Sequence, residues 1–97
     1  MSVACKTKGI GKHCRWEKPE VGHFNVTKSV FKVNGEIRLR VWYASAMSDR
    51  RTGFYVDRDR GKYWENLDTD TSLYSEGEAR LWAEQYALRT WPDEVSK

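Results

Sequence analysis

Hydrophobic and polar residues alternate along residues 27–43, which is the pattern of two strands joined as a β-hairpin. Asn34-Gly35 separates the two strands, and an Asn-Gly pair is typical of a tight turn. The second strand has an apolar side chain at every second position, so these side chains share one face. They are Ile37, Leu39, Val41 and Tyr43.

The alternation favours a three-residue hairpin loop over residues 33–35, with Gly35 in the left-handed conformation. This loop pairs Phe31 with Ile37, so the apolar side chains of both strands lie on one face. A two-residue turn would place Lys32 on that face instead. We therefore predict the longer loop, with a β-bulge. The opposite face then carries Lys28, Val30, Lys32, Arg38, Arg40 and Trp42.

Two further strands are predicted after the hairpin. Residues 53–57 alternate, with Phe54 and Val56 on one face. Residues 58–61 form a charged turn, and residues 62–67 form the fourth strand.

One helix is predicted over residues 75–91. Ser75 and Glu78 have the spacing of a capping box, in which each side chain binds the backbone N–H of the other residue. Trp91-Pro92 ends the helix, because proline disfavours a helical conformation in the residue before it. Five residues recur at helical spacing and form the expected core face: Ala79, Trp82, Ala83, Tyr86 and Ala87.

Leu81 and Leu88 are seven residues apart, so they lie together on the other side of the predicted helix. Either residues 1–24 cover them, or they contact a partner. Residues 1–24 are basic and contain three glycines and one proline, so we expect an irregular amino-terminal arm there.

These elements predict an α+β fold, in which an antiparallel sheet of three to four strands within residues 25–67 packs one face against a carboxyl-terminal helix. A chain of 97 residues has the length of one domain, so we expect residues 1–97 to share a single core. Five Trp, five Tyr and three Phe agree with a packed core, because disordered chains are poor in aromatic residues.

Several classes of protein are excluded by composition. The longest uncharged apolar run covers residues 41–44, which is too short to span a membrane. The amino terminus lacks the apolar stretch of a secretory signal, so we expect a cytoplasmic protein. No nucleophile is paired with both a base and an orienting group, so we expect no enzymatic activity, no cofactor and no small-molecule substrate.

Cys5 and Cys14 are the only cysteines, and in a cytoplasmic chain they are expected to stay reduced. Together with His13 and His23 they supply four zinc-ligand side chains. Their spacing fits no standard zinc motif, and the adjacent side chains of His13 and Cys14 point apart. We therefore expect plain thiols, with a zinc site as the alternative.

Charge divides the chain into two parts. Residues 1–62 contain fourteen Lys or Arg and six Asp or Glu, a net charge of +8. Residues 63–97 contain three Lys or Arg and eight Asp or Glu, a net charge of −5. Either the two parts attract each other within the fold, or they form two faces that bind charged partners.

The acidic residues form the first candidate interface. Carboxylates spaced along a connection and a helix imitate a row of phosphates, so they fit a basic nucleic-acid channel on another protein. The set is Glu65, Asp68, Asp70, Glu76, Glu78 and Glu84. The other interpretation of these residues is solubility and helix capping.

The basic residues form the second candidate interface, for direct binding of DNA or RNA. Cations bind phosphates, and a flat aromatic ring stacks on a base. The set is Lys28, Lys32, Arg38, Arg40, Trp42, Arg58 and Arg60. The other interpretation is an ordinary solvated sheet face.

At the level of class, the chain resembles the short inhibitor proteins that bacteriophages encode, including anti-CRISPR proteins. The resemblance covers residues 27–89, where strands precede a helix that opens with Ser75-x-x-Glu78-Ala79-x-x-Trp82. It implies a free-standing inhibitor that binds a protein or nucleoprotein complex handling nucleic acid, in the cytoplasm of a bacterial host. The class shares no motif, so the resemblance implies no site residue.

Overall fold

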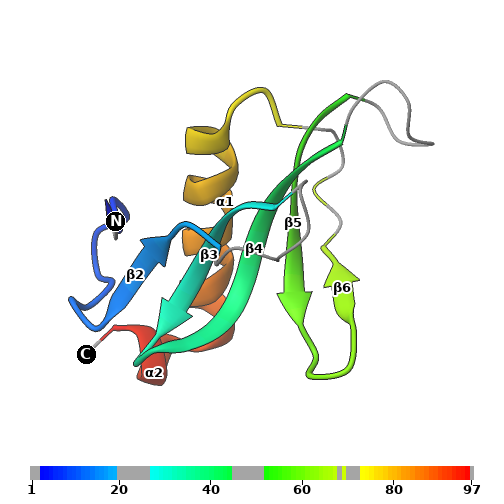
Figure 1. Cartoon of the computed structure of the whole chain (residues 1–97). Coiled ribbons are helices and arrows are strands. Elements are labelled where there is room, and N and C mark those ends of the chain that lie inside the picture. The colour runs from blue at the N-terminus through cyan, green and yellow to red at the C-terminus, as the bar shows by residue number, and fades with distance from the viewer. Residues whose placement is uncertain (1–2, 20–26, 45–51, 68, 70–72, 97) are drawn as a thin grey trace.

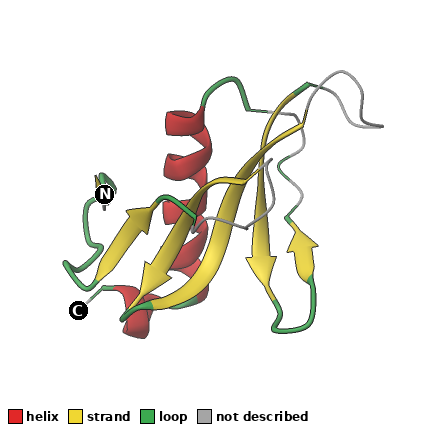
Figure 2. Ribbon diagram, viewed as in Figure 1, coloured by secondary structure: helices red, strands yellow, loops and turns green. Residues whose placement is uncertain are grey.

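The computed structural model describes residues 3–19, 27–44, 52–67, 69 and 73–96 of the chain. Within these residues, six strands form one antiparallel sheet in which each strand pairs with the next along the chain (Figure 1). Helix α1 packs on one face of the sheet, and the one-turn helix α2 follows it (Figure 2). The elements are β1 (Val3–Ala4), β2 (Cys14–Glu17), β3 (Thr27–Val33), β4 (Glu36–Ala44), β5 (Gly53–Asp59), β6 (Trp64–Asn66), α1 (Glu76–Thr90) and α2 (Pro92–Val95).

The α+β class and the carboxyl-terminal helix are confirmed, but the predicted number of strands is too low. The two additional strands, β1 and β2, lie where we predicted an irregular arm, so that prediction is wrong for residues 3–4 and 14–17, whereas residues 5–13 are irregular as expected. β2 has its own short alternation, because Cys14 and Trp16 are buried while Arg15 is exposed. Neither of the described helices is long and apolar enough to cross a membrane.

The core lies between α1 and the sheet and is built around Trp16. The Trp16 side chain is fully buried, and its ring packs against Phe31 with 5.2 Å between the ring centroids. Three alanines of α1, each four residues from the next, are also fully buried, so the helix backbone lies close to the sheet. They are Ala79, Ala83 and Ala87.

The predicted core face of the helix is confirmed for its three alanines, which are buried, and is wrong for its two aromatic residues, which are not. Trp82 and Tyr86 are half-buried at the margin of the core, where their rings stack with 5.8 Å between centroids and 9° between planes. The closely packed alanines leave no room for two large rings beneath the helix, so these rings lie at its flank. The largest fully buried side chain of the core, Trp16, comes from β2 instead.

β3 and β4 are joined by a two-residue turn, so the predicted three-residue loop is wrong. Val33 pairs with Glu36, which leaves Asn34 and Gly35 in the turn. Both have a positive φ, 52° for Asn34 and 84° for Gly35, as this hairpin turn requires. The predicted left-handed conformation of Gly35 is therefore confirmed.

A β-bulge in β4 reconciles the short turn with the apolar pattern. Lys32 pairs with Ile37 and Phe31 pairs with Leu39, so Arg38 is the extra residue and the predicted pairing of Phe31 with Ile37 is wrong. Beyond the bulge, Phe31 and Leu39 share the buried face as expected. The bulge also turns Arg38 towards α2, away from the face on which we predicted it.

Replacing Gly35 with valine is expected to lower the free energy of unfolding by about 1–2 kcal/mol. No atom lies within 4 Å of the position that the new Cβ would occupy, so the cost comes from the φ of +84°, which a β-branched residue resists. Urea unfolding measures this difference. Replacing the exposed Glu36 with valine controls for the added apolar surface. A Gly35→Val variant as stable as the unaltered protein would contradict the observed turn.

β5 and β6 follow the predicted strands with shifted ends. β5 ends at Asp59, two residues beyond the predicted end, and β6 is shorter than the predicted strand over residues 62–67. Val56 is fully buried and Phe54 packs against the core from its margin, which confirms the predicted face. Leu73, in the connection to α1, forms two backbone hydrogen bonds with Phe54.

The ends of α1 are confirmed. The Ser75 side chain accepts a hydrogen bond of 3.1 Å from the Glu78 N–H, which is one half of the expected capping box. The Glu78 carboxylate accepts a hydrogen bond of 2.9 Å from the Tyr74 N–H, one residue earlier than expected. At the other end, the Trp91 N–H donates to the Ala87 carbonyl over 2.8 Å.

The segment between β1 and β2 lies against the carboxyl-terminal part of the chain. The Gly11 N–H donates to the Val95 carbonyl over 2.8 Å. A Cβ on Gly9 would lie 3.7 Å from Leu88, so this segment covers Leu88. Leu81 remains 41% exposed. The prediction that the amino-terminal segment covers these leucines is therefore confirmed for Leu88.

Candidate functional site

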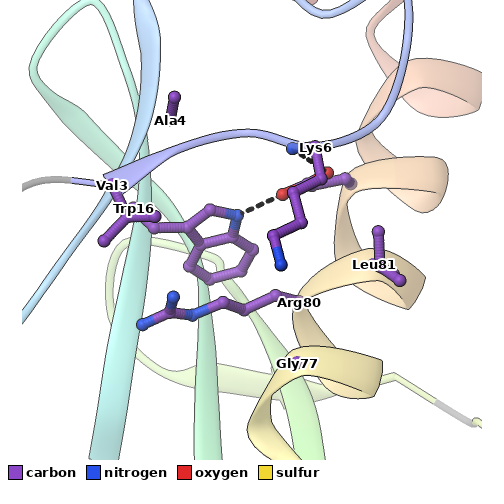
Figure 3. Close-up of a pocket in the computed structure, with 8 residues that line it drawn as sticks. Val3, Ala4, Lys6, Trp16, Gly77, Arg80 and Leu81 are labelled. Atoms are coloured by element: carbon purple, nitrogen blue, oxygen red, sulfur yellow. Dashed lines mark hydrogen bonds between the residues drawn. The ribbon is translucent and has the colours of Figure 1, made fainter.

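Glu84 is buried beneath the amino-terminal segment, although the sequence places it in the acidic surface set. Its side chain accepts hydrogen bonds from the backbone N–H of Lys6 (3.0 Å) and of Thr7 (2.7 Å), both at Oε1. Its Oε2 accepts a third, of 2.7 Å, from the indole N–H of Trp16 (Figure 3). A carboxylate is tolerated inside a protein when such donors surround it. At 2% exposure, Glu84 anchors the fold and takes no part in a surface.

The sequence contains a partial signal for this burial. Glu84 follows Leu81 by three residues and precedes Leu88 by four, so the three side chains form a stripe along one flank of α1. A carboxylate within an apolar stripe indicates partners from another segment. Those partners lie 68 to 78 positions away in the chain, and no local pattern identifies residues at that distance.

The other acidic candidates do not form one row within the described residues. Glu65 lies on β6, where it pairs with Arg60 at 2.7 Å. Glu76 lies at the start of α1, where it pairs with Arg80 at 2.7 Å. Glu78 lies in the same first turn and is exposed. Two members of the set lie outside the described residues: Asp68 and Asp70.

Arg40 lies on the face of the sheet opposite α1 and forms an ion pair with Asp57. The two charged groups are 2.8 Å apart, and the side chains are only 13% and 5% exposed. The guanidinium also lies 4.6 Å from the centroid of the Trp64 ring. Removing one partner of a buried pair costs about 3–5 kcal/mol, because the other charge remains buried. Replacing Arg40 with an acidic residue would therefore destabilise the fold, so the variant would not report on binding alone.

Arg38 and Arg58 lie on the helix side of the sheet, where they flank the Trp91 ring at 5.2 Å and 4.8 Å from its centroid. Arg38 also pairs with Glu94 at 2.6 Å, and this hydrogen bond raises the pKa of Arg38 and lowers the pKa of Glu94. Arg58 donates to the Tyr86 hydroxyl over 3.1 Å. The prediction of one continuous basic face is therefore wrong.

The remaining basic candidates include one more ion pair. Lys32 lies 3.1 Å from Glu17 on β2, whereas Lys28 is exposed on β3. Trp42 packs against Tyr55 on the face opposite α1, with 5.3 Å between centroids and 31° between the ring planes. The structure also shows exposed cations that the predicted set did not include, in the segment assigned to an arm: Lys6, Lys8, Lys12, Arg15 and Lys18.

Both cysteines have a pKa above the ordinary value. Burial raises the pKa of Cys5 from 9.0 to about 12, and the nearby Glu84 carboxylate adds to the effect. Burial also raises the pKa of Cys14. Zinc binds the thiolate, so both shifts oppose the zinc alternative. Among the described residues no three metal-binding side chains form a group, and His23 lies outside these residues.

Iodoacetamide at about pH 8 is expected to alkylate Cys5 on the order of a thousandfold more slowly in the folded protein than in urea. Each unit of pKa changes the thiolate fraction tenfold, and the pKa rises from 9.0 to about 12 on folding. Mass spectrometry of a Cys14→Ala variant measures the rate at Cys5 alone. Equal rates with and without urea would show that folding does not raise the pKa of the Cys5 thiol.

A cavity of about 110 Å³ opens between β1 and α1 (Figure 3). Val3 lines it from β1 and Leu81 from α1, and the Trp16 ring lies between them. The side chains of Lys6 and Arg80 both extend towards this space (Figure 3). The cavity therefore combines apolar walls with two cationic groups.

Two aromatic rings are strongly exposed among the described residues. Tyr74, directly before the cap of α1, is 91% exposed. Tyr63, in the turn between β5 and β6, is 63% exposed. Exposed aromatic rings are typical of surfaces that bind another macromolecule.

No protein-family model, curated protein or solved structure matches the chain. The functional inference therefore rests on the chemistry of the described residues. That chemistry consists of ion pairs, thiols of raised pKa, exposed charges and exposed rings.

Proposed function

We propose that the chain is a non-enzymatic binding protein that blocks a nucleic-acid-binding surface of a protein complex, in the manner of bacteriophage-encoded inhibitors. The contact surface is the acidic tip, which we define as Tyr74, Glu76 and Glu78. The observation that carries the proposal is the 91% exposure of Tyr74. Aromatic rings are enriched at the centres of protein interfaces, where their burial contributes much of the binding energy.

The acidic tip also carries the charge that a basic channel attracts. Glu78 is exposed, and its hydrogen bond from the Tyr74 N–H fixes the carboxylate beside the backbone of that residue. Glu76 is 36% exposed, although it pairs with Arg80 on the next turn of α1. Asp68 and Asp70 precede the tip in sequence and have the same sign of charge. Carboxylates beside an aromatic ring present negative charge next to a flat ring, as phosphates do next to a base, so they fit a channel built for nucleic acid.

Neutralising the acidic tip is expected to weaken partner binding at least tenfold. The double variant Glu76→Gln, Glu78→Gln removes both charges, and glutamine retains the capping hydrogen bond, so the helix start is kept. Tyr74→Ala, made separately, is expected to have an effect of similar size. Asp93→Asn is the matched control, because Asp93 is an exposed acid on α2 outside the tip.

The partner is captured with the tagged protein from a nuclease-treated bacterial lysate. The purified complex is then titrated with labelled nucleic acid, with and without the protein. We expect the protein to capture its partner even after nuclease treatment. We also expect the partner to release labelled nucleic acid when the protein is added. A capture that is lost on nuclease treatment, or a complex that binds protein and nucleic acid together, would contradict the proposal.

Direct binding of nucleic acid is the second candidate, and the exposed cations of residues 3–19 favour it. That segment contains one acidic residue, Glu17, which is already paired with Lys32. If the segment binds phosphates, the triple variant Lys8→Gln, Lys12→Gln, Lys18→Gln weakens binding and lowers its salt dependence by about one slope unit per lost contact. If the acidic tip is the contact surface, these changes leave partner binding unaltered.

A further inference from the structure

β1 is the outermost strand of the sheet, so one of its edges has no strand partner among the described residues. The backbone N–H and C=O groups along such an edge pair readily with an extended peptide, which then adds to the sheet as a further strand. Val3 in this strand is 41% exposed. The edge is therefore accessible within the described part of the chain.

The cavity beside this edge has the size and lining of a side-chain pocket. Leu81 of α1, also 41% exposed, lines the cavity on the side away from Val3, and the Trp16 ring lies between them (Figure 3). An apolar cavity of about 150 Å³ takes up benzene. A cavity of about 110 Å³ therefore accommodates one aliphatic side chain of the size of valine or leucine.

The charges around the cavity favour an acidic ligand. The Lys6 ammonium forms no ion pair with any described residue. Arg80 also lines the cavity, but its guanidinium is paired with Glu76 at 2.7 Å, so Lys6 supplies the cation for a ligand. The nearest carboxylate, Glu84, already accepts three hydrogen bonds from N–H donors. Glu84 is only 2% exposed, so the exposed ammonium of Lys6 is the charged group that a ligand in the cavity meets first.

We propose that this groove between β1 and α1 is a peptide-binding site. An extended acidic peptide pairs with β1 as an added strand, places one aliphatic side chain in the cavity and places a carboxylate beside Lys6. Residues two positions apart in a strand point to the same side, so the acidic residue lies two positions from the aliphatic one. The site goes beyond the proposed inhibitor function and does not require it.

The test is an NMR titration of the full chain with a defined peptide, acetyl-Thr-Glu-Thr-Leu-Thr-Glu-Thr-amide, and with the same peptide carrying Val, Ile, Met or Ala in place of Leu. We expect shifts of the backbone amides of Val3, Ala4, Gly77 and Leu81. The Ala peptide, and a peptide with Lys in place of both Glu residues, should bind at least tenfold more weakly than the Leu peptide.

Two N-methylated versions of the Leu peptide test strand addition separately from side-chain binding. Methyl groups on alternate amides block one edge of the peptide and leave its side chains unchanged. One version, blocked on the edge that faces β1, should lose binding. The other version, blocked on the outer edge, should bind within about threefold of the parent peptide.

Protein variants with matched controls locate the site. Leu81→Asp and Lys6→Gln should each weaken peptide binding at least tenfold. Gln85→Asp, an exposed change one turn along α1, and Lys8→Gln, the same charge change outside the cavity, should leave it unchanged. Neutralising Glu78 in the acidic tip should also have no effect on the peptide, so failure of this site and failure of the inhibitor function are distinguishable.

Three results would overturn the peptide site. The first is the absence of amide shifts with every aliphatic peptide at about 1 mM, where even weak binding is detected. The second is equal binding of the two N-methylated peptides. The third is unchanged binding in both Leu81→Asp and Lys6→Gln.

Discussion

Replacing Trp16 with alanine is expected to lower the free energy of unfolding by about 5 kcal/mol, the upper end of the range for a large aromatic residue in a core. Trp16 is fully buried, packs against Phe31 and donates its indole N–H to Glu84. The substitution leaves a large void and removes one of the three donors around a buried carboxylate. Domains of this size are stable by about 5–15 kcal/mol, so the variant is expected to be partly or fully unfolded.

Urea or thermal unfolding followed by circular dichroism measures the effect of Trp16→Ala. The matched control is Trp82→Ala, which removes the same side chain from a half-buried position at the margin of the core. The control is expected to cost about 1–2 kcal/mol, in proportion to the smaller area removed from water. A larger loss in Trp82→Ala than in Trp16→Ala would show that the core is assigned to the wrong tryptophan.

Replacing Glu84 with alanine is expected to cost about 3–5 kcal/mol, although the residue is charged and lies on a helix. The change leaves the N–H groups of Lys6, Thr7 and Trp16 without an acceptor inside the protein. Each buried donor without a partner costs about 1–3 kcal/mol, although rearrangement and water reduce the sum. For a domain of this length, the midpoint of thermal unfolding falls by roughly 15–30 °C.

Gln85→Ala is the matched control for Glu84, because it changes the next residue of the same helix at an exposed position. The control is expected to stay within about 0.5 kcal/mol of the unaltered protein. Glu84→Gln gives an intermediate loss, because its amide oxygen replaces one acceptor while its amide nitrogen meets an N–H donor. A Glu84→Ala protein as stable as the control would contradict the anchoring role.

The sequence predicts α1 well because its signals are local. Ser75 and Glu78 lie three residues apart, and Trp91 stands directly before a proline, so both ends of the helix are defined within a few residues. The hairpin is predicted in its place but not in its register. A bulge at Arg38 satisfies both the Asn-Gly turn and the apolar pattern, and its position depends on packing against α1 and α2.

β1 and β2 escape prediction because they are short. Their two and four residues contain too few positions for a periodic pattern to exceed chance, and the glycines between them indicate a loop. Trp16 is the exception within this segment, since a tryptophan flanked by charged residues needs a buried site. What places it in the core is pairing with β3, a contact between distant parts of the chain.

The charged candidates illustrate why composition does not locate a site. Arg40 and Glu84 are counted among surface charges in the sequence, but Glu84 is buried, Arg40 is largely buried, and each is bonded to a partner elsewhere in the chain. Arg38 and Arg58 are directed to the helix side by the bulge and by the register of β5. Pairing of this kind depends on tertiary contacts, so net charge predicts the attraction between the two parts but not which residues remain available to a partner.

The closed core and the adjacent groove both depend on the hydrogen bonds by which Glu84 holds the amino-terminal segment against α1. Amide hydrogen exchange of Lys6 and Thr7 tests these hydrogen bonds most directly. If Glu84 is the anchor, these two amides exchange at least about a hundredfold more slowly than the amide of the exposed Lys8, and Glu84→Ala removes the protection. Exchange of Lys6 and Thr7 at the rate of Lys8 in the unaltered protein would contradict the anchor.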